Sequence, residues 1–204
     1  MLKLSTNDQD IWITSDTHFY HKNITKCVTS WTDYEMIRDF QTIDEMTDTI
    51  INGINKNVKE NDILFHLGDW SFGGFVNILN ARKRINCKNI YIIYGNHDTH
   101  IFKNKLLDKE NNIYAQDLFN CLGFSTLVEI DSKSVYLSHF PVDYVRFDKP
   151  HYHLHGHLHG INNVKDYLLK KNRLDIGIDS AFNMFGEYRP FNWKEIKKLC
   201  EKHL

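Results

Sequence analysis

The stretch "IWITSDTH" (residues 11–18) decides the fold, because a short apolar run ends there in a carboxylate and an imidazole. Its first four residues are β-branched or aromatic, which is typical of a buried strand. Three later stretches also run from apolar residues into polar ones: "DILFHLGD" (62–69), "NIYIIYGNHD" (89–98) and "SVYLSHFP" (134–141). The sequence therefore predicts several strands whose ends carry polar side chains.

Helices are predicted between and after these strands. Thr32 and Glu35 form a capping-box pattern, and an apolar stripe with spacings of three and four residues follows it. The stripe consists of Met36, Phe40, Ile43, Met46, Ile50 and Ile54. Residues 75–85 and 192–203 indicate two further helices. The strand–helix–strand order favours an α/β layered fold, and the closely spaced strands after residue 124 favour a mixed sheet or a pair of sheets.

The composition is that of an ordinary globular protein, with 204 residues, 42% hydrophobic and 25% charged. A single domain over residues 1–204 is expected, because the length suits one domain and no linker or repeat divides it. The four cysteines form no CxxC pattern, which favours reduced thiols in a cytoplasmic protein. Neither a signal-peptide pattern nor an apolar run long enough for a membrane span is visible.

The formal net charge of −1 argues against a protein that grips long nucleic acids through their phosphates. A nucleotide or a short oligonucleotide stays possible as a substrate. The small basic clusters at 81–84 and 170–173 fit a solvated face better than a nucleic-acid patch. The oligomeric state stays open.

The polar strand ends are expected to meet, because ligands of open α/β folds bind at the carboxyl ends of the strands. Seven side chains there are potential metal ligands: Asp16, His18, Asp69, Asn96, His139, His157 and His159. A nitrogen and oxygen set without thiolates suits manganese, iron or zinc. One ion with an open position takes about three or four protein ligands, so seven indicate two ions. Asp69 is the natural bridge, since Asp16 is the only other carboxylate.

Five motifs in this order resemble those of the calcineurin-like metallophosphoesterase superfamily. They are D-x-H (16–18), G-D (68–69), G-N-H-D (95–98), H (139) and G-H-x-H (156–159). The resemblance extends from about residue 11 to residue 181 and is to small bacterial and phage-encoded members. It implies a four-layer α/β/β/α sandwich in which two mixed β-sheets are flanked by helices.

The resemblance also implies a role for each residue of the motifs. The first metal would be held by Asp16, His18 and His159, the second by Asn96, His139 and His157, and both by Asp69. His97 would bind no metal but would donate a proton to the leaving oxygen, while a hydroxide held between the ions attacks the phosphate. Two Mn²⁺ ions are favoured, and iron, zinc or nickel would also fit.

One block departs from the family pattern of the protein Ser/Thr phosphatases. Those enzymes carry Asp and Arg where "GDWSFG" has Phe72 and Gly73. The missing Arg removes a clamp suited to a dianionic monoester, and the missing Asp leaves Asp98 as a substitute to orient His97. We therefore favour a phosphodiesterase acting on a nucleotide or short nucleic acid. The alternatives are a phosphomonoesterase for a small metabolite and a non-catalytic metal-binding scaffold.

The run "HYHLHGHLHG" (151–160) contains five histidines, of which only His157 and His159 follow the family pattern. His153 and His155 are expected to pack or to orient ligands, and His151 to be exposed. Glycine precedes Asp69, Asn96 and His157 in the chain, and we expect it to allow sharp turns there.

Two histidines outside the motifs have separate expectations. His66 lies within a strand and is interpreted as a core or supporting imidazole, and His21 as a residue that could touch substrate. Substrate specificity is expected to reside in residues 99–123 and 160–173, neither of which contains a readable motif.

Overall fold

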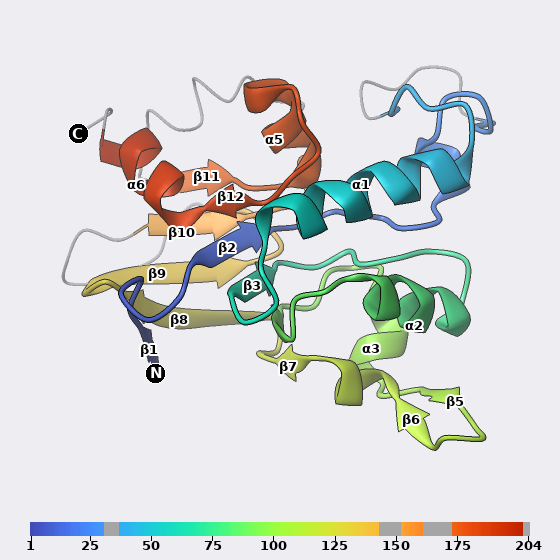
Figure 1. Cartoon of the computed structure of the whole chain (residues 1–204), viewed down its shortest axis with the longest axis horizontal. Coiled ribbons are helices and arrows are strands. Elements are labelled where there is room, and N and C mark those ends of the chain that lie inside the picture. Colours follow the sequence, from blue (N-terminus) through green and yellow to red (C-terminus); the bar gives the residue numbers. More distant parts are fainter. Residues whose placement is uncertain (31–36, 143–151, 161–172, 202–204) are drawn as a thin grey trace.

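Two five-stranded sheets carry the fold. The structure is a computed structural model that describes residues 1–30, 37–142, 152–160 and 173–201 (Figure 1). The first sheet has the order β12 (Phe191–Asn192), β2 (Ile11–Thr14), β3 (Ile63–His66), β4 (Asn89–Ile92) and β7 (Asn120–Cys121). Its strands β2, β3, β4 and β7 run parallel, and β12 is antiparallel to β2.

The second sheet is also mixed. Its order is β1 (Leu2–Leu4), β8 (Ser125–Ile130), β9 (Lys133–Ser138), β10 (Tyr152–His155) and β11 (Arg173–Asp175). Strands β8 and β9 form an antiparallel pair, whereas the other neighbours are parallel. The two sheets confirm the expected pair of mixed sheets flanked by helices.

The helices lie between and after the strands, as predicted. They are η1 (Lys22–Ile24), α1 (Ile43–Asn57), α2 (Phe75–Arg84), α3 (Thr99–Phe102), η2 (Ala115–Leu118), α5 (Ile178–Phe185) and α6 (Trp193–Glu201). The expected specificity segment 99–123 contains α3, η2, β7 and the two-stranded sheet of β5 (Leu106–Asp108) and β6 (Ile113–Tyr114). Most of the segment 160–173 lies outside the described residues.

Successive side chains along the strands of the first sheet belong alternately to two separate hydrophobic cores. Trp12 and Leu64 pack with buried residues of α1 and α2, whereas Ile13 and Phe65 pack with the second sheet. Successive side chains of a strand point to opposite faces, so runs that are apolar on both faces indicate a sheet covered on both sides. This burial holds the strand ends of the first sheet in fixed positions.

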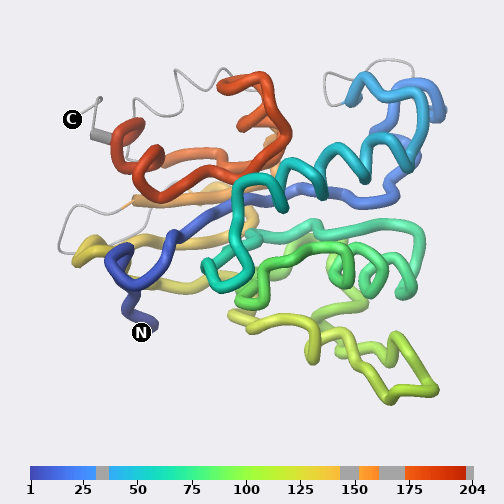
Figure 2. Tube along the Cα trace, viewed as in Figure 1, coloured from blue at the N-terminus to red at the C-terminus, as the bar shows by residue number. Residues whose placement is uncertain are grey.

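Segments far apart in the sequence lie side by side on one side of the molecule. Figure 2 shows the red segment of α5 next to the cyan helix α1. A Cβ atom at Gly53 of α1 would overlap the carbonyl oxygen of Tyr188, so glycine permits this close approach.

The first helix begins later than the sequence predicts. Helix α1 starts at Ile43, and its N-cap is Thr42, whose side chain accepts a hydrogen bond from the Glu45 amide. Thr32 and Glu35 lie outside the described residues, and residues 37–42 are not helical. The sequence Thr42–Glu45 has the same T-x-x-E spacing as the pattern at Thr32, and Thr42 is the residue that caps α1.

Two further sequence expectations concern cysteines and membranes. None of the four cysteines forms a disulfide. Among the helices of the described ranges, none combines the length and the apolar character that crossing a bilayer requires.

The position of the α1 cap can be tested by unfolding. Thr42→Ala is expected to lower the free energy of unfolding by about 1 kcal/mol, because the Glu45 amide loses its acceptor. Thr49→Ala, at an exposed position within α1, is the matched control and should change stability little. Urea denaturation followed by circular dichroism measures both, and equal effects of the two substitutions would contradict the assigned cap.

Candidate metal centre

The loops after β2 and β3 lie against each other beyond the strand ends. The backbone amides of Asp16 and His18 donate to the carbonyl oxygens of Gly68 and Asp69, at 2.9 and 3.1 Å. Asp16, His18 and Asp69 have φ values of 55°, 46° and 59°. Left-handed backbone is uncommon for residues other than glycine and concentrates at functional sites. The loops therefore hold these ligand candidates in fixed, strained positions.

The glycines of the motifs lie where the chain turns and where it approaches buried carboxylates. Gly68 has a φ of 97°, which agrees with the expected sharp turn. Gly95 and Gly156 are not left-handed, but the Asp98 amide donates to the Gly95 carbonyl oxygen at 3.3 Å, which closes a turn that begins at Gly95. A Cβ atom at Gly95 would overlap the Asp69 carboxylate, and one at Gly156 would overlap the Asp16 carboxylate. These two glycines also let the backbone approach the buried carboxylates.

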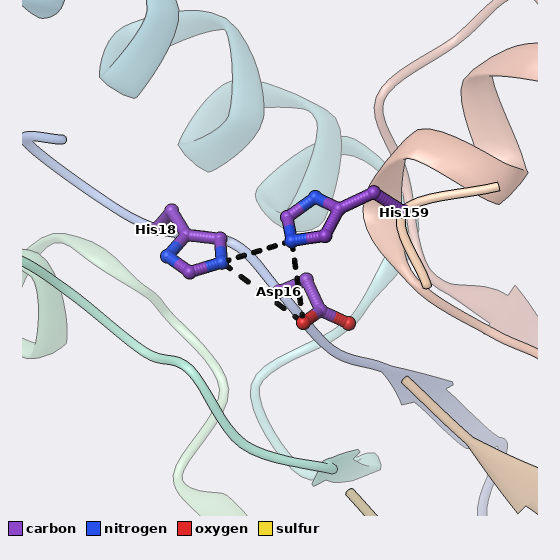
Figure 3. Close-up of side chains that lie close together, drawn as sticks. All are labelled: Asp16, His18 and His159. Carbon is purple, nitrogen blue, oxygen red and sulfur yellow. Dashed lines mark hydrogen bonds and ion pairs between the residues drawn. The ribbon is translucent and has the colours of Figure 1, made fainter. Parts of the chain in front are cut away.

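The first half of the site joins Asp16, His18 and His159 (Figure 3). The Nε2 atoms of His18 and His159 lie 3.2 Å apart, and they lie 4.0 and 3.8 Å from Asp16 Oδ1. All three side chains are buried, and Asp16 Oδ1 accepts no hydrogen bond from the described residues. Burial, followed by the proximity of His159, keeps the pKa of His18 well below its usual value. Two imidazole nitrogens and an unpartnered carboxylate oxygen thus face a common point, which suits a cation.

The second half of the site is centred on His139. Its Nδ1 lies 2.9 Å from the carbonyl oxygen of Leu67, so in a neutral ring Nδ1 carries the hydrogen. Its Nε2 then has only a lone pair, yet it lies 2.9 Å from Asn96 Oδ1 and 3.5 Å from Asp69 Oδ2. Three acceptors that face one another without a hydrogen between them fit a shared metal ion.

Asp69 lies between the two halves. Its Oδ2 is 3.6 Å from His18 Nε2 and 3.5 Å from His139 Nε2. Burial raises the pKa of Asp69 to about 7, although His139 opposes the shift. This position agrees with the bridging role that the sequence suggests, and a buried carboxylate of this kind is stabilised by a nearby cation.

His157 is the seventh ligand candidate and lies next to His139, with ring centroids 5.2 Å apart. Its backbone amide donates to Asp16 Oδ2 at 2.9 Å, which ties the G-H-x-H segment to the first half of the site. The structure thus gathers all seven candidates in one place. Asn96 and His157 are exposed, whereas the first half is buried, so the second half is the more open to solvent.

Asp98 does not orient His97, although the sequence suggested it as a substitute for the missing aspartate of the family pattern. Its carboxylate accepts hydrogen bonds from the amides of Asp69, Trp70 and Gly95, at 2.7, 3.0 and 2.8 Å. Burial raises the pKa of Asp98, and these amide donors oppose that shift. Asp98 therefore fastens the loop that carries Asp69 to the loop that carries Asn96.

Arg38 and Asp179 form a support that the sequence did not reveal. The buried Arg38 guanidinium donates to both Asp179 oxygens, at 2.7 and 2.8 Å, and to the carbonyl oxygens of Asp16 and Thr17. Asp179 also lies 2.8 Å from His159 Nδ1. Burial opposes ionisation of Asp179, but Arg38 and His159 outweigh it and lower the pKa of Asp179 to about 2. No local motif marks either residue, because they are 141 positions apart.

The other histidines lie around the site without joining the ligand set. His66 Nε2 lies 2.9 Å from Thr17 Oγ1, and His153 Nε2 lies 2.9 Å from Ser138 Oγ. His155 is fully buried, and its Nδ1 lies 2.9 Å from the Gly156 carbonyl oxygen. These contacts agree with the packing and supporting roles expected of the three. His151 lies outside the described residues.

His97 stands at the open edge of the site, with 43% of its side chain exposed. Its amide donates to Asp69 Oδ1 at 2.9 Å, and its Nε2 lies 3.9 Å from Asp69 Oδ2. The ring packs against Phe72, which in turn stacks on His21 with centroids 3.6 Å apart. Burial, followed by the proximity of His139, lowers the pKa of His97, whereas a bound anion would favour its charged form.

These side chains enclose a metal pocket of about 140 Å³. It is lined by His18, His21, Ile24, Asp69, Asn96, His97, His157 and His159. Within the described part of the chain, the lining contains neither lysine nor arginine. The negative charge of the buried carboxylates is thus left for metal ions to balance.

The support behind His159 can be tested separately from the ligands. Asp179→Asn is expected to weaken Mn²⁺ binding about 10- to 100-fold. It should also destabilise the fold by about 3–5 kcal/mol, because Arg38 loses its buried counter-ion. Calorimetric titration and chemical unfolding of the metal-free protein measure the two effects. Asp48→Asn, which breaks the exposed pair with Arg84, is the control and should change stability by less than about 1 kcal/mol.

Comparisons with known proteins agree with the geometry. The family model for calcineurin-like phosphoesterases matches residues 10–203. An uncharacterized protein of Methanocaldococcus jannaschii, MJ1445, is 27% identical over 197 residues, which cover 94% of this chain and 92% of that protein.

A solved structure is similar in fold. It is a protein of unknown function from Aquifex aeolicus, AQ665, with a TM-score of 0.61 and 24% identity, covering 94% of this chain and 99% of that one. That likeness concerns the fold alone, whereas the family model spans nearly the whole sequence. The chain belongs to the calcineurin-like phosphoesterase family.

Proposed function

We propose that this protein is a phosphodiesterase that uses two divalent metal ions and acts on a nucleotide or a short nucleic-acid diester. The family supports a metal-dependent phosphoester hydrolase. One observation carries the proposal: His139 Nε2, Asn96 Oδ1 and Asp69 Oδ2 face one another. With the His139 hydrogen on Nδ1, none of these three acceptors has a hydrogen to donate to the others. Such a set fits a cation, and Asp16, His18 and His159 form a second group of facing donor atoms.

The ligands divide between the two halves of the site. Asp16, His18 and His159 would hold the first ion, and Asn96, His139 and His157 the second, with Asp69 between them. Manganese is favoured, although iron, zinc and nickel accept the same donors. When bound, the two ions would activate water near neutral pH and offset the charge of the phosphate oxygens.

His97 would act as the general acid. It lines the metal pocket and is exposed to an incoming substrate. Its Nε2 lies close to Asp69 Oδ2, so a phosphate at the metals would lie within its reach. The negative charge of that phosphate favours the protonated imidazole, which can then pass its proton to the leaving oxygen.

The preference for a diester is supported by the charge of the pocket. A monoester carries about one negative charge more than a diester at neutral pH, and enzymes commonly meet that charge with a guanidinium clamp. Arg38 cannot supply one, because Asp179 and two backbone carbonyls occupy its guanidinium. A cavity of about 250 Å³, lined by residues 71–74 and 96–100, adjoins His97 and leaves room for a second ester group.

Aromatic side chains around the pocket support a nucleotide-like substrate. Phe140 is 47% exposed and lies beside His157, with ring centroids 4.6 Å apart. Exposed aromatic faces of this kind stack on nucleobases.

Ester preference is tested with two chromogenic substrates. The Mn²⁺-loaded protein should hydrolyse bis-p-nitrophenyl phosphate with a higher kcat/KM than p-nitrophenyl phosphate. Chelation should abolish both activities, and added Mn²⁺ should restore them. Absence of turnover with manganese, nickel, iron and zinc on either ester would falsify the proposal, and a preference for the monoester would favour the phosphomonoesterase instead.

The role of His97 is tested by separating metal content from turnover. His97→Ala should keep the metal content of the wild type and lower kcat about 100- to 10,000-fold, the usual contribution of a general acid. His159→Ala, in contrast, should lose both metal and activity. Elemental analysis and steady-state kinetics measure the two variants, and a loss of metal from His97→Ala would show that His97 is a ligand.

A further inference from the structure

A second, larger cavity lies beside the metal pocket. Its volume is about 610 Å³, and residues of both α1 and α5 line it; Figure 1 shows where these two helices lie. His159 lines both this cavity and the metal pocket, so the two share a wall. A cavity of this size is typical of sites for small organic ligands.

The cavity presents an aromatic face. Phe182 and Tyr188, which both line it, are stacked with ring centroids 4.4 Å apart and an angle of 12° between their planes. Phe182 is nevertheless 42% exposed. Tyr188 is fixed against α1 at Gly53, where no side chain would fit. The stacked pair therefore forms an aromatic platform, and its exposed Phe182 side can receive a further flat ring.

The charges in the cavity do not favour a phosphate as its occupant. Apart from His159, the described lining includes two cationic side chains, which are those of Arg38 and Lys56. Arg38 is paired with Asp179, and Lys56 Nζ lies 3.2 Å from Glu187 Oε1. Both cations are paired and Asp39 is a third carboxylate in the lining, so the described lining offers an anion no unpaired cation. Asn52 and Asn183 add amides that can both donate and accept hydrogen bonds.

We infer that this cavity binds the nucleobase of the substrate while the phosphate lies at the metal pocket. The inference rests on the proposed function, because it assigns a place to the base of a nucleotide-like diester. An uncharged aromatic ring with hydrogen-bonding edges matches the Phe182–Tyr188 platform and the two amides. Phe182 is thus a specificity-determining residue.

Two diesters with the same leaving group isolate the contribution of the base. They are the p-nitrophenyl ester of a nucleoside 5′-phosphate and methyl p-nitrophenyl phosphate, assayed with the Mn²⁺-loaded protein. Phe182→Ala should lower kcat/KM for the nucleoside ester about fivefold or more, the effect of losing one base–aromatic stack. The kcat/KM for the methyl ester should stay unchanged. Phe185→Ala is the matched control, since Phe185 lies in the same helix, is 37% exposed and does not line the cavity.

The possible outcomes separate the two proposals. If the wild type hydrolyses both esters but Phe182→Ala lowers both equally, changes neither or behaves like Phe185→Ala, the nucleobase site is refuted while the phosphodiesterase stands. If neither ester is hydrolysed, the proposed function fails. Equilibrium dialysis of an unphosphorylated nucleoside against the metal-free protein then tests the nucleobase site independently. The site predicts that the wild type binds the nucleoside and that Phe182→Ala weakens this binding. Melting temperatures of both variants check that they fold.

Discussion

Two buried carboxylates that pair with no lysine or arginine of the described residues impose the constraint that the rest of the site satisfies. Asp16 and Asp69 are 0% and 2% exposed, and burial raises the pKa of Asp69 to about 7. Buried carboxylates are normally paired or bound to metal. The described lining of the metal pocket offers imidazoles and an amide instead of lysine or arginine. Divalent cations are the partners that such a set of donors can accept.

The surrounding structure holds these donors so that they cannot relax away from each other. Asp98 fastens the loops after β3 and β4 through three amides. Arg38 fastens the loop after β2 and, through Asp179, fixes His159. Gly95 and Gly156 let two backbones lie directly against the carboxylates. Preorganisation of this kind orients metal ligands and raises their affinity, so the supports matter as much as the ligands.

Much of the fold could be predicted from the sequence, because its signals are local. The strands near residues 11, 63, 89 and 134 follow from β-branched and aromatic runs, and α2 and α6 from helical patterns. The start of α1 was misplaced, because Thr32 and Thr42 both precede a glutamate by three residues and only tertiary packing selects between them. The two mixed sheets and the family are confirmed.

The supports of the site were not predictable in the same way. Arg38 and Asp179 become partners only because α5 packs near the segment that precedes α1. Likewise, the need for Gly95 depends on a carboxylate from another strand end. The ordered motifs identified the seven ligand candidates and His97, which the structure gathers, whereas their roles as ligands and general acid stay proposals.

Anomalous X-ray scattering from crystals grown with Mn²⁺ tests the central claim most directly. Two peaks of anomalous density are predicted on either side of the Asp69 carboxylate. One should lie among Asp16, His18 and His159, and the other among Asn96, His139 and His157, with His97 bound to neither. A single peak, no peak, or a peak coordinated by His97 would contradict the two-metal site.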